Sequence, residues 1–111
     1  DLLGLTLVLR KKIELGELIF LDTGAGMLEI LCPKSAQIER SRDVPLHEAG
    51  IRHLTLAYDD IDEIFARVEA AGVEIIERPR PAINTEILNR VAFVRDPDGI
   101  FVELIERAAG R

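Results

Sequence analysis

A β-hairpin is predicted by Asn89-Arg-Val-Ala-Phe-Val-Arg-Asp-Pro-Asp-Gly-Ile-Phe-Val-Glu-Leu-Ile-Glu106. Proline presets φ for a turn and glycine accepts a positive φ, so residues 96–99 are expected to join two strands. Side chains alternate between the faces of a strand, which places Glu103 on a largely apolar face with Phe101 and Ile105. A lone carboxylate there costs free energy unless it is paired, binds a cation or lines a wet cavity. Glu103 is therefore the first candidate site residue.

The length and composition of the chain limit the type of protein it can be. A chain of 111 residues has the size of one domain, and 48% hydrophobic with 31% charged residues is typical of globular proteins. The net charge of −6 and the lack of a basic stripe argue against nucleic acid as a partner. No apolar run reaches membrane-spanning length, so no membrane partner is expected. The single cysteine, Cys32, excludes an internal disulfide; it is expected to be a small buried hydrophobe in a cytoplasmic protein.

Runs of β-forming residues predict further strands, and two prolines predict a break after one of them. Pro79 and Pro81 are expected to open a loop that reaches Thr85. The other strands are expected at residues 5–10, 17–22, 27–31, 51–57 and 73–77.

One helix is predicted after residue 60. Asp60 and Glu63 have the spacing of a capping box, with Asp in place of the usual Ser or Thr, and Gly72 is a typical C-terminal stop. The apolar stripe consists of Ile61, Ile64, Phe65 and Val68.

The strand at residues 51–57 carries a histidine on one face. The two-residue period places His53 and Thr55 together, opposite Leu54 and Leu56. A single histidine on a strand is more often structural than a metal ligand, so His53 becomes a candidate only together with other donors. The other histidine, His47, is expected to be a solvated loop residue.

The sequence contains an internal repeat. The aligned pairs are Gly4 with Gly72, Phe20 with Phe93, and Glu29 with Glu103. Glu29 thereby becomes a candidate equivalent to Glu103, although its strand could be an edge at which an acidic residue faces water. A counterpart of His53 would precede Asp1, so the leading strand and most of the helix of the first repeat are expected to lie upstream.

The repeat predicts an α+β protein built from two βαβββ modules, the first of them incomplete. The expected division is a first module at residues 1–32, a connector at 33–50, a complete second module at 51–107 and a tail at 108–111.

This pattern resembles the vicinal oxygen chelate superfamily, which includes glyoxalase I, bleomycin-binding proteins and extradiol dioxygenases. The resemblance covers nearly the whole chain and is strongest in the run Gly-Ile-Arg-His-Leu-Thr-Leu from Gly50 and in the hairpin. It implies a curled mixed sheet around a cavity. In metal-dependent members, the first and last strands of each module supply the ligands; by position these are His53, Glu103 and Glu29, with the fourth upstream of Asp1.

The resemblance also implies a function. Nitrogen and oxygen donors suit Zn²⁺, Ni²⁺, Co²⁺, Mn²⁺ or Fe²⁺. The expected activity is that of a metal-dependent lyase or isomerase, similar to glyoxalase I, that acts on a small α-oxo or vicinal-oxygen substrate through an enediolate, with Glu103 as the base. The alternative is a metal-free protein of the bleomycin-resistance type that binds and sequesters a ligand. In either case a small-molecule ligand and a homodimer are implied.

Two departures from the family pattern limit the resemblance. Glyoxalase I usually has a small residue two positions after the ligand histidine, where this chain has Thr55, and no cluster can be assigned to glutathione. Phe93 and Val94 replace the tyrosine that the extradiol dioxygenase signature expects ahead of the turn, which argues against ring cleavage.

Overall fold

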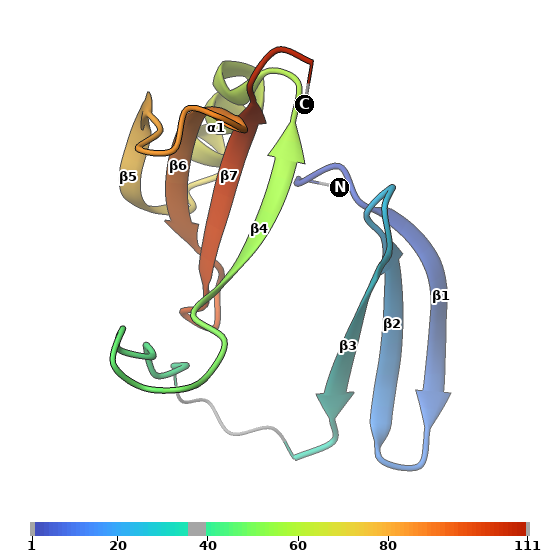
Figure 1. Ribbon diagram of the computed structural model, residues 1–111. Helices are drawn as coiled ribbons and strands as arrows, with labels where there is room; N and C mark the ends of the chain where they lie inside the picture. Colours follow the sequence, from blue (N-terminus) through green and yellow to red (C-terminus); the bar gives the residue numbers. More distant parts are fainter. Residues whose placement is uncertain (1, 36–39, 111) are drawn as a thin grey trace. The chain divides into compact units, whose positions relative to one another are not determined.

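The computed structural model describes residues 2–35 and 40–110 and has an α+β fold. The chain divides into two compact units, Asp1–Ile38 and Glu39–Arg111, each with its own sheet (Figure 1).

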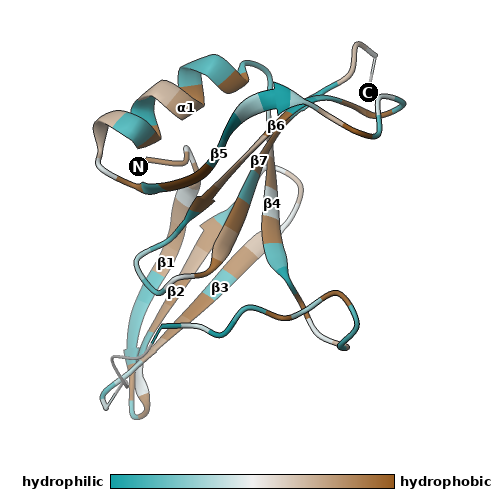
Figure 2. Ribbon diagram, turned by 90° about the vertical axis from the view of Figure 1, so that its left-hand side faces the viewer, coloured by the Kyte–Doolittle hydropathy of each residue, from teal (hydrophilic) through white to brown (hydrophobic). Residues whose placement is uncertain are grey.

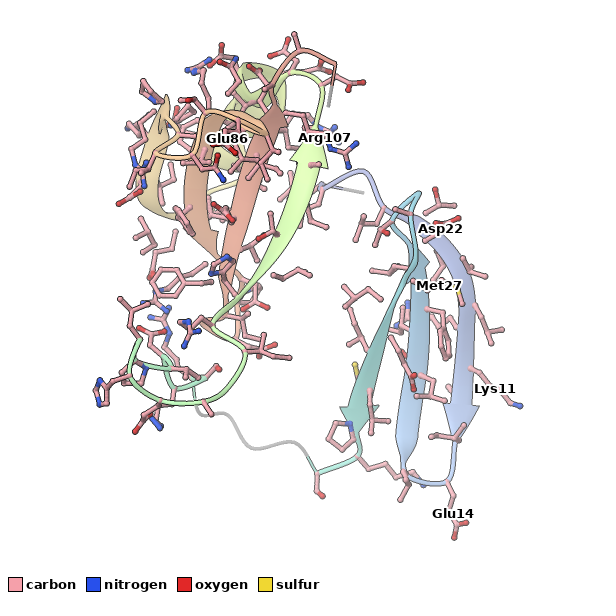
Figure 3. All side chains as sticks on the ribbon, in the orientation of Figure 1. Lys11, Glu14, Asp22, Met27, Glu86 and Arg107 are labelled. Carbon is pink, nitrogen blue, oxygen red and sulfur yellow. The ribbon has the colours of Figure 1, made fainter. Side chains whose placement is uncertain are left out.

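The first unit is a three-stranded antiparallel sheet. Its strands are β1 (Thr6–Ile13), β2 (Gly16–Asp22) and β3 (Met27–Pro33), paired in the order β1-β2-β3. The three strands predicted here are confirmed. Figure 3 shows Glu14 at the turn between β1 and β2, and Asp22 and Met27 at the opposite end of the sheet. None of the described side chains of this unit is buried.

The second unit has the βαβββ order that the repeat predicts. It consists of β4 (His53–Tyr58), α1 (Ile61–Ala70), β5 (Glu74–Pro81), β6 (Leu88–Arg95) and β7 (Phe101–Arg107). The sheet order is β4-β7-β6-β5, with β4 parallel to β7 and the other pairs antiparallel (Figure 1). This sheet is mixed and not closed into a barrel.

The helix forms where its stripe and cap predict it. The Asp60 side chain accepts hydrogen bonds from the backbone N–H groups of Asp62 (3.0 Å) and Glu63 (3.2 Å), and Gly72 has a φ of 77° just after the helix. Figure 2 shows hydrophobic and hydrophilic bands alternating along α1. The buried side chains of the helix are Ile61, Ile64, Phe65 and Val68.

The hydrophobic core lies between α1 and one face of the second sheet. Leu104 on β7 and Ala92 on β6 are cross-strand partners, and both are fully buried. Leu56 on β4 pairs with Leu104 from the other side. Because side chains alternate, residues 53, 55 and 103 fall on the opposite face, away from this core. One face of this sheet is therefore buried against α1, and the opposite face carries the polar candidate site residues.

The predicted loop from Pro79 is wrong, because β5 continues to Pro81. β5 is an edge strand, and its pairing with β6 shifts register between Glu77 and Arg80, the interval that contains Pro79. Proline lacks a backbone N–H, so it is tolerated at a sheet edge or an irregularity but not in a central strand.

The internal repeat is visible in the strand registers. Phe20 is the cross-strand partner of Glu29 in the first sheet, and Phe93 is the partner of Glu103 in the second. Both repeats thus place a phenylalanine directly beside a glutamate on one sheet face.

Two further expectations concern the cysteine and membrane spans. Cys32 is exposed near the end of β3, so the expectation that it is buried is wrong. Within residues 2–35 and 40–110, no helix has the length and apolarity needed to cross a membrane.

Leu104→Ala should lower the free energy of unfolding by about 2–5 kcal/mol, because it leaves a cavity beneath α1. Urea denaturation followed by circular dichroism measures the change. The control is Ile83→Ala, at a side chain that is 95% exposed, where a change within about 0.5 kcal/mol is expected. An equal effect of the two substitutions would contradict the assigned core.

Candidate functional site

His53 and Glu103 come together on neighbouring strands. β4 and β7 pair in parallel, with His53 opposite Phe101 and Thr55 opposite Glu103. The Nε2 atom of His53 lies 3.2 Å from Oε1 of Glu103. The side chains are 37% and 15% exposed, so the carboxylate is largely shielded while the imidazole remains accessible.

Thr55 contacts the same carboxylate oxygen. Its hydroxyl donates a hydrogen bond of 2.8 Å to Oε1 of Glu103. The second oxygen, Oε2, accepts no hydrogen bond from the described part of the chain. Oε1 is therefore held by the Thr55 hydroxyl beside Nε2 of His53, while Oε2 is left without a hydrogen bond from the described residues.

Two aromatic rings lie in a row beside His53. The imidazole of His53 meets the ring of Phe93 edge to face, with centroids 5.6 Å apart, and Phe93 meets Phe101 in the same way at 6.4 Å. Such arrangements are favourable between rings and restrict the orientation of each. Apolar rings beside a carboxylate also exclude water, which strengthens electrostatic interactions at the site.

Two donor atoms lie at a separation compatible with binding one divalent metal ion. Two ligands at about 2.1 Å from one ion lie about 3.0 Å apart at octahedral angles and about 3.4 Å apart at tetrahedral angles. The 3.2 Å between Nε2 of His53 and Oε1 of Glu103 falls between these values. The described residues contain no cluster of three or more His, Cys, Asp or Glu side chains able to hold a metal. Glu29, the remaining predicted ligand, is exposed on β3 of the first unit.

A small cavity adjoins His53. It has a volume of about 170 Å³, and its wall includes His53, Phe101, Ile100 and Arg52. Asp43, from the segment that precedes β4, completes one side of it. A cavity of this size suits a ligand of a few non-hydrogen atoms, with the imidazole of His53 at its boundary.

Arg95 holds Asp43 in the wall of this cavity, a role that no sequence motif indicates. Its guanidinium binds both oxygens of Asp43, at 2.9 and 2.8 Å, and donates to the carbonyl oxygen of Gly99 at 2.6 Å. It also lies 4.0 Å from the ring centroid of Phe101. The hydrogen bond from Arg95 lowers the pKa of the Asp43 carboxyl group. A bidentate pair of this kind is geometrically specific.

Comparison with known proteins identifies a family and several relatives. The sequence model of the Glyoxalase/Bleomycin resistance protein/Dioxygenase superfamily matches residues 1–104 of this chain. A probable lactoylglutathione lyase of Synechocystis is 26% identical over 113 residues, which cover 98% of this chain and 82% of that protein. A probable chloroplastic lactoylglutathione lyase of Arabidopsis thaliana is 36% identical over 59 residues; these cover 53% of this chain but only 16% of that protein.

A solved structure agrees with the fold. The crystal structure of the glyoxalase family protein from Enterococcus faecalis superposes with a TM-score of 0.68 at 29% sequence identity. The superposition covers 94% of this chain and 79% of that protein.

Asp43→Asn should lower the melting temperature at pH 7, because it removes the carboxylate that pairs with Arg95. A carboxyl group whose pKa is lower in the folded state contributes stability above its unfolded pKa, and this contribution disappears as the pH falls through the folded pKa. The difference in melting temperature between wild type and variant should therefore shrink as the pH falls below about 4.

Thermal unfolding between pH 7 and pH 2 measures this difference. Asp59→Asn is the matched control, since Asp59 is exposed and makes no ion pair within the described residues. A difference from wild type that stays constant over the whole pH range would show that the pair with Arg95 is not its cause.

Proposed function

This chain belongs to the Glyoxalase/Bleomycin resistance protein/Dioxygenase superfamily, and we propose that it is a divalent-metal-dependent lyase or isomerase. It would act on a small α-oxo or vicinal-oxygen substrate through an enediolate. The observation that carries the proposal is the approach of His53 Nε2 to Glu103 Oε1, at 3.2 Å on the face of the sheet that is not covered by α1. The lyase names of two relatives support the reaction class.

The proposed ligands are His53, Glu103 and Glu29. Imidazole and carboxylate donors suit Zn²⁺, Ni²⁺, Co²⁺, Mn²⁺ or Fe²⁺. Glu29 is included because the repeat gives it a phenylalanine partner, Phe20, just as it gives Phe93 to Glu103. A bound divalent ion would stabilise the negative charge that develops on a substrate oxygen.

Glu103 is the proposed base. Its Oε2 is free of hydrogen bonds from described residues and can accept a proton from the carbon next to a substrate carbonyl. The rings of Phe93 and Phe101 limit the access of water to the carboxylate. The cavity of about 170 Å³ beside His53 is proposed to hold the substrate, which must therefore place only a small group there.

A metal-free ligand-binding protein of the bleomycin-resistance type is the second candidate. Thr55 and His53 already provide polar neighbours for Oε1 of Glu103, so the carboxylate does not need a metal ion to be satisfied. The net charge of −6 would favour a cationic ligand. Metal binding and turnover distinguish the two candidates.

The proposed assembly is a homodimer, and the proposed compartment is the cytoplasm. An isolated three-stranded sheet needs a covered hydrophobic face to be stable. Several large apolar side chains of the first unit are exposed, and we propose that a second copy of the chain covers some of them. They are Leu7, Val8, Leu9, Met27 and Leu31. Cys32 is free and exposed, which suits a reducing compartment.

Added Co²⁺, Ni²⁺ or Zn²⁺ should raise the melting temperature of the wild-type protein. Saturation at 100 times the dissociation constant corresponds to about 2.7 kcal/mol of added stability. His53→Ala and Glu103→Gln should abolish most of this gain, because each removes one ligand. Thermal scans of chelator-treated protein with each ion, together with metal analysis of the purified protein, provide the measurement.

Matched controls are available for both substitutions. His47→Ala alters the other histidine, which is exposed as expected, and Glu86→Gln alters an exposed glutamate between β5 and β6 (Figure 3). Both variants should respond to metal as the wild type does. A wild-type protein without stoichiometric metal and without a thermal response to any of the ions would exclude the metal-dependent proposal.

Glu103→Gln should also slow proton transfer by about 10²–10⁴-fold, since glutamine cannot act as a base. Each protein is incubated with lactoylglutathione in deuterated water at a metal concentration that saturates it, and nuclear magnetic resonance follows deuterium incorporation next to the thioester carbonyl. Glu86→Gln should match the wild type. If wild-type protein that binds metal catalyses no exchange, this compound is not its substrate; if it also fails with simpler α-oxo compounds, the ligand-binding function is favoured.

A further inference from the structure

We propose that Thr55 is a positioning residue that holds Oε1 of Glu103 beside Nε2 of His53, where the two atoms could bind one metal ion, and thereby directs Oε2 toward the substrate. The inference rests on the proposed metal-dependent function of the same site. It concerns a residue that touches neither metal nor substrate and acts through Glu103. The observation behind it is the 2.8 Å hydrogen bond from the Thr55 hydroxyl to Oε1.

The backbone sets the position of the Thr55 hydroxyl. Thr55 is the direct partner of Glu103 in the parallel pairing of β4 with β7, so the two side chains leave the sheet next to each other. Threonine is branched at Cβ, which restricts χ1. Glutamate, in contrast, has three rotatable side-chain bonds and samples several rotamers unless its carboxylate is held. A stiff donor beside a flexible acceptor is therefore suited to select one orientation of the carboxylate.

The other neighbour of Oε1 cannot keep this role when metal is bound. A histidine nitrogen that binds a metal ion carries no proton, so it has no hydrogen to donate to the carboxylate. His53 Nε2, which lies 3.2 Å from Oε1, would then have no hydrogen to direct at the carboxylate. Among the described residues, Thr55 would be the remaining hydrogen-bond donor to Glu103.

Unlike a ligand, Thr55 can be altered without changing the donor set. Thr55→Val replaces the hydroxyl by a methyl group of similar size and leaves His53 and Glu103 in place. Thr55→Ser retains the hydroxyl but loses the branch. Residues that orient metal ligands typically change metal affinity by about 10–100-fold when they are replaced.

The first arm of the test measures metal affinity. Titration with Co²⁺, followed by its visible absorption, should give a dissociation constant for Thr55→Val that is about 10–100-fold higher than for the wild type. Thr55→Ser should restore the affinity to within a few-fold of wild type. Thr6→Val, at a strand threonine whose hydroxyl has no partner in the described residues, should bind as the wild type does.

The second arm does not need metal. Side-chain coupling constants of Glu103 in the metal-free protein should report one χ1 rotamer in the wild type and in Thr55→Ser, and averaging between rotamers in Thr55→Val. A purely structural role of Thr55 would instead lower the melting temperature of the metal-free protein without changing the rotamer populations of Glu103.

The two arms separate the two proposals. If the wild type binds Co²⁺ and Thr55→Val binds it equally well, the positioning role is overturned and the metal-dependent function stands. If the wild type binds no metal ion, the proposed function fails, and the rotamers of Glu103 then decide whether Thr55 positions it. An unchanged single rotamer in Thr55→Val would overturn the inference in that case as well.

Discussion

The parallel pairing of β4 with β7 is the constraint on which the second unit depends. It sets Leu56 beside Leu104 on the face covered by α1, and it sets Thr55 beside Glu103 on the opposite face. Because the side-chain period of a strand is two residues, a slip of one position would exchange these two faces. The burial of Leu104 and the exposure of the site to ligands are thus two results of a single register. Helix α1 reinforces this register, since Glu106 on β7 accepts a hydrogen bond from the backbone N–H of Ile61 at 3.0 Å.

Much of the fold could be predicted from local sequence. Helix α1 is marked by its stripe, by Asp60 at its start and by Gly72 after its end, and each of these signals acts within a few residues. The repeat of Phe20 and Glu29 in Phe93 and Glu103 was also visible, because strand alternation and hairpin turns are local features. The family resemblance, carried by the same residues, matches the superfamily found by comparison.

Features that depend on pairing between distant strands were not predictable. The sequence shows that His53 and Thr55 share a face, but their distance from Glu103 depends on the β4–β7 register. In the sequence, Thr55 is distinguished only as a departure from the pattern of glyoxalase I. Arg95 gave no signal, because its partner Asp43 is far away along the chain. Pro79 illustrates the opposite case. Locally a proline predicts the end of a strand, but β5 lies at the edge of the sheet, where a residue without a backbone N–H is tolerated.

The alternation of the two faces has a consequence for how proteins of this superfamily can diverge. Even and odd positions of β7 have different structural roles. Val102 and Leu104 pack in the core. Phe101, Glu103 and Ile105 lie on the opposite face of the strand. Substitutions at the odd positions can change donor atoms, charge or ligand size with little effect on the packing under α1. Insertion of a single residue, however, would exchange the two sets at once. New activities are therefore accessible through point substitutions on one face, while the length of the strand is held fixed by the core.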